Sequence, residues 1–199
     1  MHKWCYDLLE KSLNEKPHIV FSNIITNGWG KVLFAKALPF NYVALSRHWN
    51  YIMIHTVTND ELKNDAFICT IAHEMTHIRC AKQYKDLHNK VNHMSATSEN
   101  KKCCMQFINW VDEVAADYGI KWYYKGKDKI QSIMINSCIF KKSLKKKDKD
   151  HFTHPSWEKR LSFAENYTCF DSSLIKRIAG LCNCKNKALI KMAIEYYVQ

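Results

Sequence analysis

The chain has 199 residues, 47% of them hydrophobic and 13% aromatic, so it is long and apolar enough to bury the core of one domain. Its 30 basic against 19 acidic residues give a formal charge of +11, which favours an anionic partner such as nucleic acid, a membrane surface or an acidic protein. The cysteine count is odd, and we find neither a secretion signal nor a transmembrane run. These features argue against a disulfide framework, so we expect free thiols and a reducing cytoplasm.

The N-terminal part of the chain is predicted to hold a short helix followed by strands. Residues 2–14 place apolar side chains near one face of an amphipathic helix that closes before Pro17. The next segments are apolar and are separated by turn signals such as Asn27-Gly28, so we expect a small, mostly antiparallel sheet. Its expected strands are 18–26, 30–38, 41–47 and 51–57.

The remainder of the chain is predicted to be mainly helical. From Ala66 the apolar positions recur at helical spacing through the sequence Ile-Ala-His-Glu-Met-Thr-His, which predicts a largely buried helix. The polar stretch 85–100 is expected to be a loop, and the basic segment 141–149 a solvated run. Further helices are expected at about 101–124, 128–140, 156–167 and 172–198.

The sequence His-Glu-Met-Thr-His is the first candidate for a functional site. Positions i and i+4 lie one turn apart on the same face of a helix, so His73 and His77 can direct both imidazoles at one metal ion. Glu74 follows the first histidine and is placed to act as general base on a metal-bound water. A catalytic zinc site uses three protein ligands, so this motif alone leaves one ligand missing.

A second segment, Asp-Glu-Val-Ala-Ala-Asp-Tyr-Gly at 112–119, can complete that site. Glu113 and Asp117 are again four residues apart on a predicted helix, so both carboxylates can face the same way. Glu113 is the candidate third ligand, and Asp117 the candidate acceptor for the free N–H of a ligand histidine. Asp112 is expected to be the solvated member of this acidic cluster.

A third segment, Thr-His-Pro-Ser-Trp-Glu-Lys-Arg-Leu at 153–161, offers two cationic groups. His154 precedes a proline, and Arg160 follows six residues on. Such donors can stabilise the oxyanion that forms when a peptide carbonyl is attacked. The alternative for Arg160 is a salt bridge on a helix surface, with Glu165 or Asp117 as its partner.

These three segments, in this order, resemble the gluzincin metallopeptidases of the HtpX and CAAX-prenyl-protease type. The resemblance covers roughly residues 30–165. It implies an α+β fold, a mostly helical zincin-like domain with a small N-terminal antiparallel sheet packed beside the HExxH helix. We expect one metallopeptidase domain over residues 1–199, with a C-terminal helical tail from about 166 that has no counterpart in the family. Thr76 stands where family members usually carry glycine.

The resemblance also implies roles for individual residues. The implied ligands of one catalytic Zn²⁺ ion are His73, His77 and Glu113. Glu74 is the implied general base and acid, and Asp117 lies outside the ligands. His154 and Arg160 are implied near the substrate carbonyl, or as structural braces. The expected activity is that of a zinc metalloendopeptidase, a hydrolase that cleaves protein or peptide substrates.

Three alternatives stay open from the sequence. A cytoplasmic regulator protease of the ImmA/IrrE type pairs the same helix motif with a downstream glutamate on a helix. A SprT-like protease would use a third histidine, His88 or His93, in place of Glu113. Without catalysis, the chain could be a basic module that binds an anionic membrane or nucleic acid through the Lys-rich segment 141–149.

Overall fold

The computed structural model describes residues 3–15, 18–22, 25–26, 29–30, 42–46 and 61–198. Its helices are α1 (Lys3–Ser12), α3 (Glu61–Arg79), α4 (Ala81–Asn92), α5 (Ser98–Tyr118), α6 (Ile120–Tyr123), α7 (Ile130–Ser143), α8 (Trp157–Asn166), α9 (Ser172–Leu181) and α10 (Lys187–Tyr197), with a short 3₁₀ helix at Lys127–Lys129. Its strands are β1 (His18–Ser22), β2 (Ile25–Thr26), β3 (Trp29–Gly30) and β4 (Tyr42–Ser46).

The predicted fold class is wrong, because the described chain does not contain the small antiparallel sheet. Residues 61–198 hold helices and no strand, and the N-terminal strands pair differently from the prediction. β1 pairs in parallel with β4, and β2 and β3 form an antiparallel ladder of two residues each. Apolar runs and turn signals predict where strands lie, but a parallel partner far along the chain leaves no local signal. The segment expected as a strand at 51–57 lies outside the described residues.

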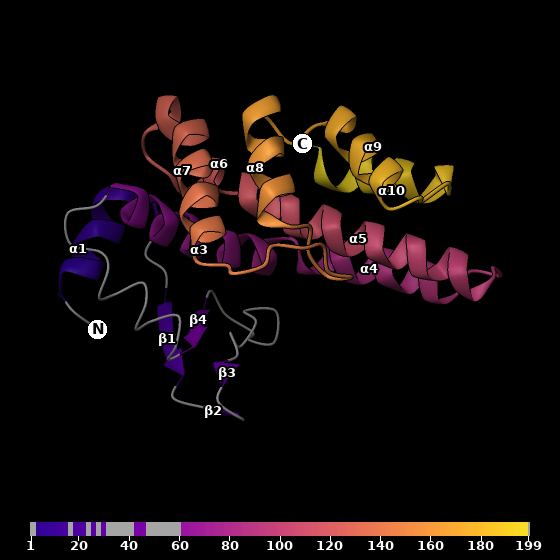
Figure 1. Ribbon diagram of the computed structural model, residues 1–199, viewed down its shortest axis with the longest axis horizontal. Helices are drawn as coiled ribbons and strands as arrows, with labels where there is room; N and C mark the ends of the chain where they lie inside the picture. Colours follow the sequence, from indigo (N-terminus) through magenta and orange to yellow (C-terminus); the bar gives the residue numbers. More distant parts are fainter. Residues whose placement is uncertain are drawn as a thin grey trace.

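The helices form layers around the two long helices α3 and α5. α7 packs on α3 and on α8. The two shorter helices α7 and α8 stand side by side across the long helices (Figure 1). α9 and α10 cover α5 further along, and α10 also contacts α4. The middle of α3 is buried all round from Asp65 to His77 because it has neighbours on several sides.

Most of the polar stretch expected as a loop at 85–100 is helical instead, because α4 continues to Asn92 and α5 begins at Ser98, which leaves a loop only at 93–97. Leu87 and Val91 are fully buried one turn apart, and these two side chains seat α4 on its neighbours. α5 begins after Thr97, whose side chain accepts a hydrogen bond from the Asn100 N–H and so caps the helix. The many polar residues on the outer faces conceal this narrow apolar stripe in the sequence.

Helices α3 and α5 approach closely where α5 ends. Thr76 lies 1% exposed on α3, with its hydroxyl bonded to the carbonyl of Ala72. A Cβ atom added to Gly119 would lie 2.6 Å from both Cβ and Cγ2 of Thr76, which is too close for any real side chain. Gly119 has an ordinary helical φ of −64°, so space and not backbone conformation requires glycine at this position.

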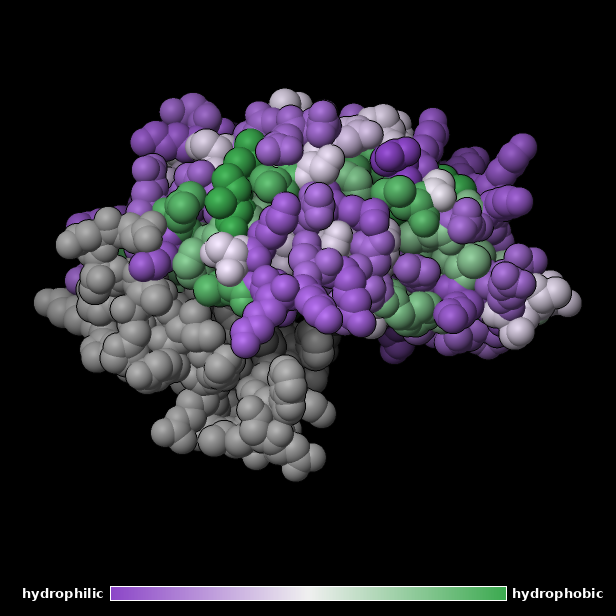
Figure 2. Space-filling view, in the orientation of Figure 1, coloured by the Kyte–Doolittle hydropathy of each residue, from purple (hydrophilic) through white to green (hydrophobic). Residues whose placement is uncertain are grey.

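Hydrophilic residues cover much of the face shown in Figure 2, with a hydrophobic strip where α7 and α8 stand together. The basic segment begins inside α7, where Lys141 is buried with its Nζ 4.9 Å from the centre of the Trp157 ring. The lysines that follow the helix, Lys145, Lys146, Lys147 and Lys149, are exposed. None of the helices in the part of the chain that the structure describes has both the length and the apolar character needed to cross a bilayer.

We predict that Gly119→Ala destabilises the protein, because the new methyl group cannot be accommodated against Thr76. The expected loss is about 1–3 kcal/mol in the free energy of unfolding, typical of overpacking, and is measured by denaturant titration. The matched control is Gly180→Ala in α9, where an added Cβ meets nothing within 4 Å. In a Thr76→Gly background the Gly119→Ala substitution should cost much less; an unchanged cost would show that this contact is not the cause.

Candidate metal centre

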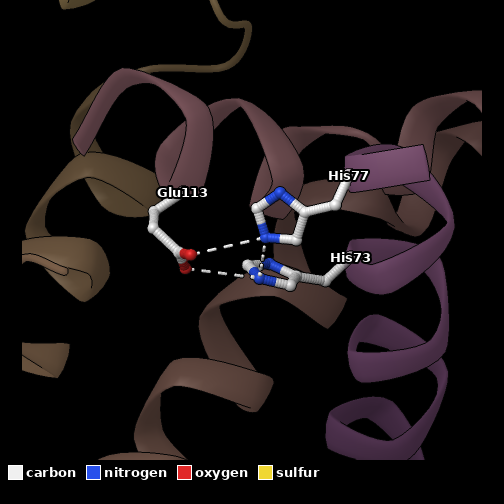
Figure 3. Close-up of side chains that lie close together, drawn as sticks. All are labelled: His73, His77 and Glu113. Atoms are coloured by element: carbon white, nitrogen blue, oxygen red, sulfur yellow. Dashed lines mark hydrogen bonds and ion pairs between the residues drawn. The ribbon is translucent and has the colours of Figure 1, made fainter. Parts of the chain in front are cut away.

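The two histidines of the sequence motif lie on one face of α3. Their rings are buried and meet edge to face, with centroids 4.6 Å apart. The Nε2 atom of His73 lies 3.0 Å from the Nε2 atom of His77. Both nitrogens therefore point to one place beside the helix (Figure 3).

Glu113 of α5 supplies the third group. Its Oε2 lies 3.4 Å from Nε2 of His73, and its Oε1 lies 3.4 Å from Nε2 of His77. Figure 3 shows the carboxylate reaching from the opposite helix towards both rings. The three side chains form a buried group whose ligand atoms are close enough together to hold a metal ion. The group expected from the sequence as a ligand set is thus brought together by the packing of α3 on α5.

Asp117 and Arg160 lie behind His73. Oδ1 of Asp117 is 3.0 Å from Nδ1 of His73, one helical turn beyond Glu113. The guanidinium of Arg160 donates from Nε to Oδ2 of Asp117 at 2.7 Å and from a second nitrogen to Oδ1. The same guanidinium stacks 3.8 Å from the centre of the Trp157 ring. Burial alone would raise the pKa of Asp117, but Arg160 and His73 lower it well below its usual range, so Asp117 stays an anionic acceptor.

Asp112 lies behind His77, where the sequence did not place it. It is 2% exposed and not solvated as expected. Its Oδ2 is 2.9 Å from Nδ1 of His77, and its Oδ1 accepts a hydrogen bond of 2.8 Å from the Tyr197 hydroxyl. Its buried neighbours Val111 and Val114, which favour burial of Glu113 and Asp117, favour burial of Asp112 as well. No sequence signal connects Tyr197 to this site.

These contacts set the charges of the group when no metal is bound. Burial lowers the pKa of His77, but the carboxylates of Asp112 and Glu113 outweigh it and raise the value to about 10. Burial likewise raises the pKa of Glu113, yet the two histidines hold it well below its usual range. Glu113 is therefore ionised, as a metal ligand must be.

Glu74 is buried on α3 directly after His73. Its Oε2 has no hydrogen-bond partner among the residues that the structure describes. A buried carboxylate oxygen without a partner is costly, so such an atom calls for an explanation, for which an unseen water or a catalytic role is the usual one. The general-base role inferred for Glu74 provides such an explanation.

His154 lies at the edge of the group and the other candidate histidines lie outside it. The side chain of His154 is 41% exposed, with Nε2 3.8 Å from Oε1 of Glu113. Burial and the nearby Arg160 lower its pKa, against the opposing effect of Glu113. His88 lies on α4 against the ring of Tyr84, and His93 ends that helix with its Nδ1 at the carbonyl of Asn89. Neither belongs to the metal-binding group found among the described residues.

Comparisons with known protein families, with curated proteins and with solved structures found no match to this chain.

We predict that the protein binds one metal ion per chain through this group. His73→Ala, His77→Ala and Glu113→Ala should each weaken binding by more than the roughly 10–100-fold typical of losing an outer partner. Elemental analysis after equilibration with a metal buffer measures the loss. The control is His93→Ala, which removes an exposed histidine outside the group. Full metal retention by Glu113→Ala would mean that another residue is the third ligand.

We also predict that Arg160→Met destabilises the fold, because it leaves Asp117 as a buried carboxylate without its cation. Removal of one partner of a buried ion pair typically costs about 3–5 kcal/mol. Chemical denaturation of the metal-free protein measures this, with Arg177→Met on the exposed side of α9 as the control. Wild-type stability of Arg160→Met would argue against a bracing role for this arginine.

Proposed function

We propose that this protein is a zinc-dependent endopeptidase that hydrolyses peptide bonds. The observation that carries the proposal is the buried group of His73, His77 and Glu113, which can hold a metal ion. Two imidazoles and one carboxylate are a donor set of catalytic zinc sites, which keep a fourth position for water. Tetrahedral zinc with bonds of about 2.0–2.1 Å separates its ligand atoms by about 3.3 Å. The separations here, 3.0 and 3.4 Å, suit an ion of that size.

In the proposed reaction Glu74 moves the proton. Zinc would supply Lewis-acid polarisation of the scissile carbonyl and would acidify a water molecule. Glu74 takes the proton of that water and delivers it to the leaving amine. Its buried Oε2, which has no partner among the described residues, supports this role because the atom is not committed to another group.

His154 and Arg160 have different roles in this proposal. The partly exposed ring of His154, at the edge of the group, is suited to donate a hydrogen bond to the developing oxyanion of the substrate. The guanidinium of Arg160 is buried and bonded to Asp117, so it acts as a brace for Asp117 and, through it, for His73. Of the two roles that the sequence left open for Arg160, near the substrate carbonyl or as a structural brace, the proposal takes the second.

The choice of peptide bonds as substrate rests on the resemblance to gluzincin peptidases. The order of the three motifs, and the position of Glu113 against both histidines, support it over the SprT-like alternative, whose third histidine would be His88 or His93. The ImmA/IrrE-type alternative shares the two histidines and the glutamate, and differs in the protein that is cut. Cleavage of a purified substrate does not separate these two proteases, whereas identification of the cleaved cellular protein does.

A reducing cytoplasm and an anionic partner are also part of the proposal. The described cysteines are free thiols, which suits a reducing compartment. The exposed lysines that follow α7, Lys145, Lys146 and Lys147, can attract acidic stretches of a protein substrate.

The test is the Glu74→Gln variant, which removes the base and keeps the shape of the side chain. Zinc-loaded protein is incubated with fluorescein-labelled casein and with a mixture of quenched fluorescent peptides. We expect wild-type cleavage to stop with a chelator, and to fall by about 10²–10⁴-fold in Glu74→Gln, the usual contribution of a general base. The zinc content of the variant should stay at the wild-type level.

The matched control is Glu99→Gln, an exposed glutamate at the start of α5, which should cleave like the wild type. Cleavage by Glu74→Gln at the wild-type rate would contradict the mechanism. If the zinc-loaded wild type cleaves neither substrate but binds anionic vesicles or nucleic acid, the non-catalytic binding module is the better description.

A further inference from the structure

The last turn of α10 reaches the metal centre through one hydroxyl group. Tyr197 is 5% exposed, and its hydroxyl donates a hydrogen bond of 2.8 Å to Oδ1 of Asp112. The two residues are 85 positions apart in the chain. The other carboxylate oxygen of Asp112 lies 2.9 Å from Nδ1 of His77. A continuous chain of three side chains therefore runs from the C-terminal helix to a candidate metal ligand.

Packing fixes the position of Tyr197. Leu189, Ala193 and Tyr197 are buried at four-residue spacing, and they form the inner face of α10. This helix contacts α4, α5 and α9, and the ring of Tyr197 lies 6.2 Å from that of Phe170. The start of α10 is capped by Asn186, whose side chain accepts from the Leu189 N–H. The hydroxyl is thus held at its place by many contacts at once.

The chemistry of this chain suits a metal site. A carboxylate that faces Nδ1 of a histidine favours the tautomer with its proton on Nδ1, which leaves the Nε2 lone pair for the metal. Nε2 of His77 is the atom that faces Glu113 and His73. A phenol that donates to the far oxygen of Asp112 fixes the orientation of the carboxylate and leaves its negative charge in place.

The carboxylates behind the two histidines are therefore held by groups of different kinds. The carboxylate behind His73 is held by the guanidinium of Arg160, a full positive charge. The carboxylate behind His77 is held by a neutral hydroxyl, from a helix that follows the three sequence motifs. Nothing in those motifs calls for Tyr197.

We infer that Tyr197 is a positioning residue of the metal centre, which orients Asp112 and, through it, His77, so that α10 is a working part of the site. This inference rests on the proposed function in that it assumes zinc as the bound ion. We expect the removal of this hydroxyl, which bonds to Asp112 and not to a candidate ligand, to change the affinity for zinc and the geometry of its ligands.

The experiment compares Tyr197→Phe with the wild type in full-length protein. Zinc dissociation constants are measured by competition with a chromogenic chelator, and the ligand geometry is followed by the visible spectrum of cobalt(II)-loaded protein. We expect zinc affinity to weaken several-fold, up to about tenfold. Loss of a residue that bonds directly to a metal ligand typically costs about 10–100-fold, and Tyr197 is one step further from the ligand. We also expect a changed cobalt spectrum.

Tyr118→Phe is the matched control. It removes another buried hydroxyl that donates hydrogen bonds, in this case to the carbonyls of Phe163 and Tyr167 at 2.9 Å. Both variants should lower the stability of the metal-free protein to a similar extent. Only Tyr197→Phe should change zinc affinity and the cobalt spectrum, because only its hydroxyl bonds to a carboxylate that contacts a ligand.

A double-mutant cycle with Asp112→Asn tests the path. If Tyr197 acts through Asp112, the effect of Tyr197→Phe on zinc affinity largely disappears when Asp112 is already replaced. Equal effects in both backgrounds, or wild-type zinc affinity and cobalt spectrum in Tyr197→Phe, would overturn the inference. If the wild type itself binds no zinc, the proposed function is wrong. This result is distinct from the two results above, which contradict only the role of Tyr197.

Discussion

The close contact between α3 and α5 is the constraint on which the metal centre depends. Thr76 lies between the two histidines of α3, and it meets Gly119 at the end of α5 with no room for another carbon atom. This contact lets one glutamate on α5 reach both Nε2 atoms across the interface. A branched residue on one helix is thus matched by a glycine on the other.

The same interface concentrates buried carboxylates around the two histidines, an arrangement that suits a cation. The four carboxylates buried or nearly buried around the histidines are Glu74, Asp112, Glu113 and Asp117. Arg160 balances one of them, and without a metal the protonated ring of His77 compensates for part of the rest. Buried charge of one sign is costly in a medium of low dielectric constant. A divalent cation between the histidines and Glu113 would supply the missing positive charge, and its binding would then be linked to the stability of this core.

The sequence predicted the grouping of His73, His77 and Glu113 better than the fold around it, and the reason is the range of the interactions involved. His73, His77, Glu113 and Asp117 are related by four-residue spacing within helices, which a helical period of 3.6 residues translates directly into a shared face. The parallel pairing of β1 with β4 and the hydrogen bond of Asp112 with Tyr197 depend on segments far away in the chain. For Asp112 the deciding neighbour is Tyr197, and no local pattern could reveal a partner 85 residues on.

The residues that support His73 and His77 come from different parts of the chain, and only the support of His77 includes the C-terminal tail. His73 is held by Asp117 and Arg160, which belong to the second and third motifs, so a chain that ended near residue 165 would still contain that support. The support of His77 has its first member, Asp112, in the second motif and its last, Tyr197, in α10. This tail buries a hydroxyl that donates a hydrogen bond to Asp112, and Asp112 is the carboxylate that contacts His77. The net energy of such a buried hydrogen bond is modest, but it fixes the orientation of the two groups that it joins. The candidate metal centre therefore draws on both ends of the helical region 61–198, on α3 at its start and on α10 at its close.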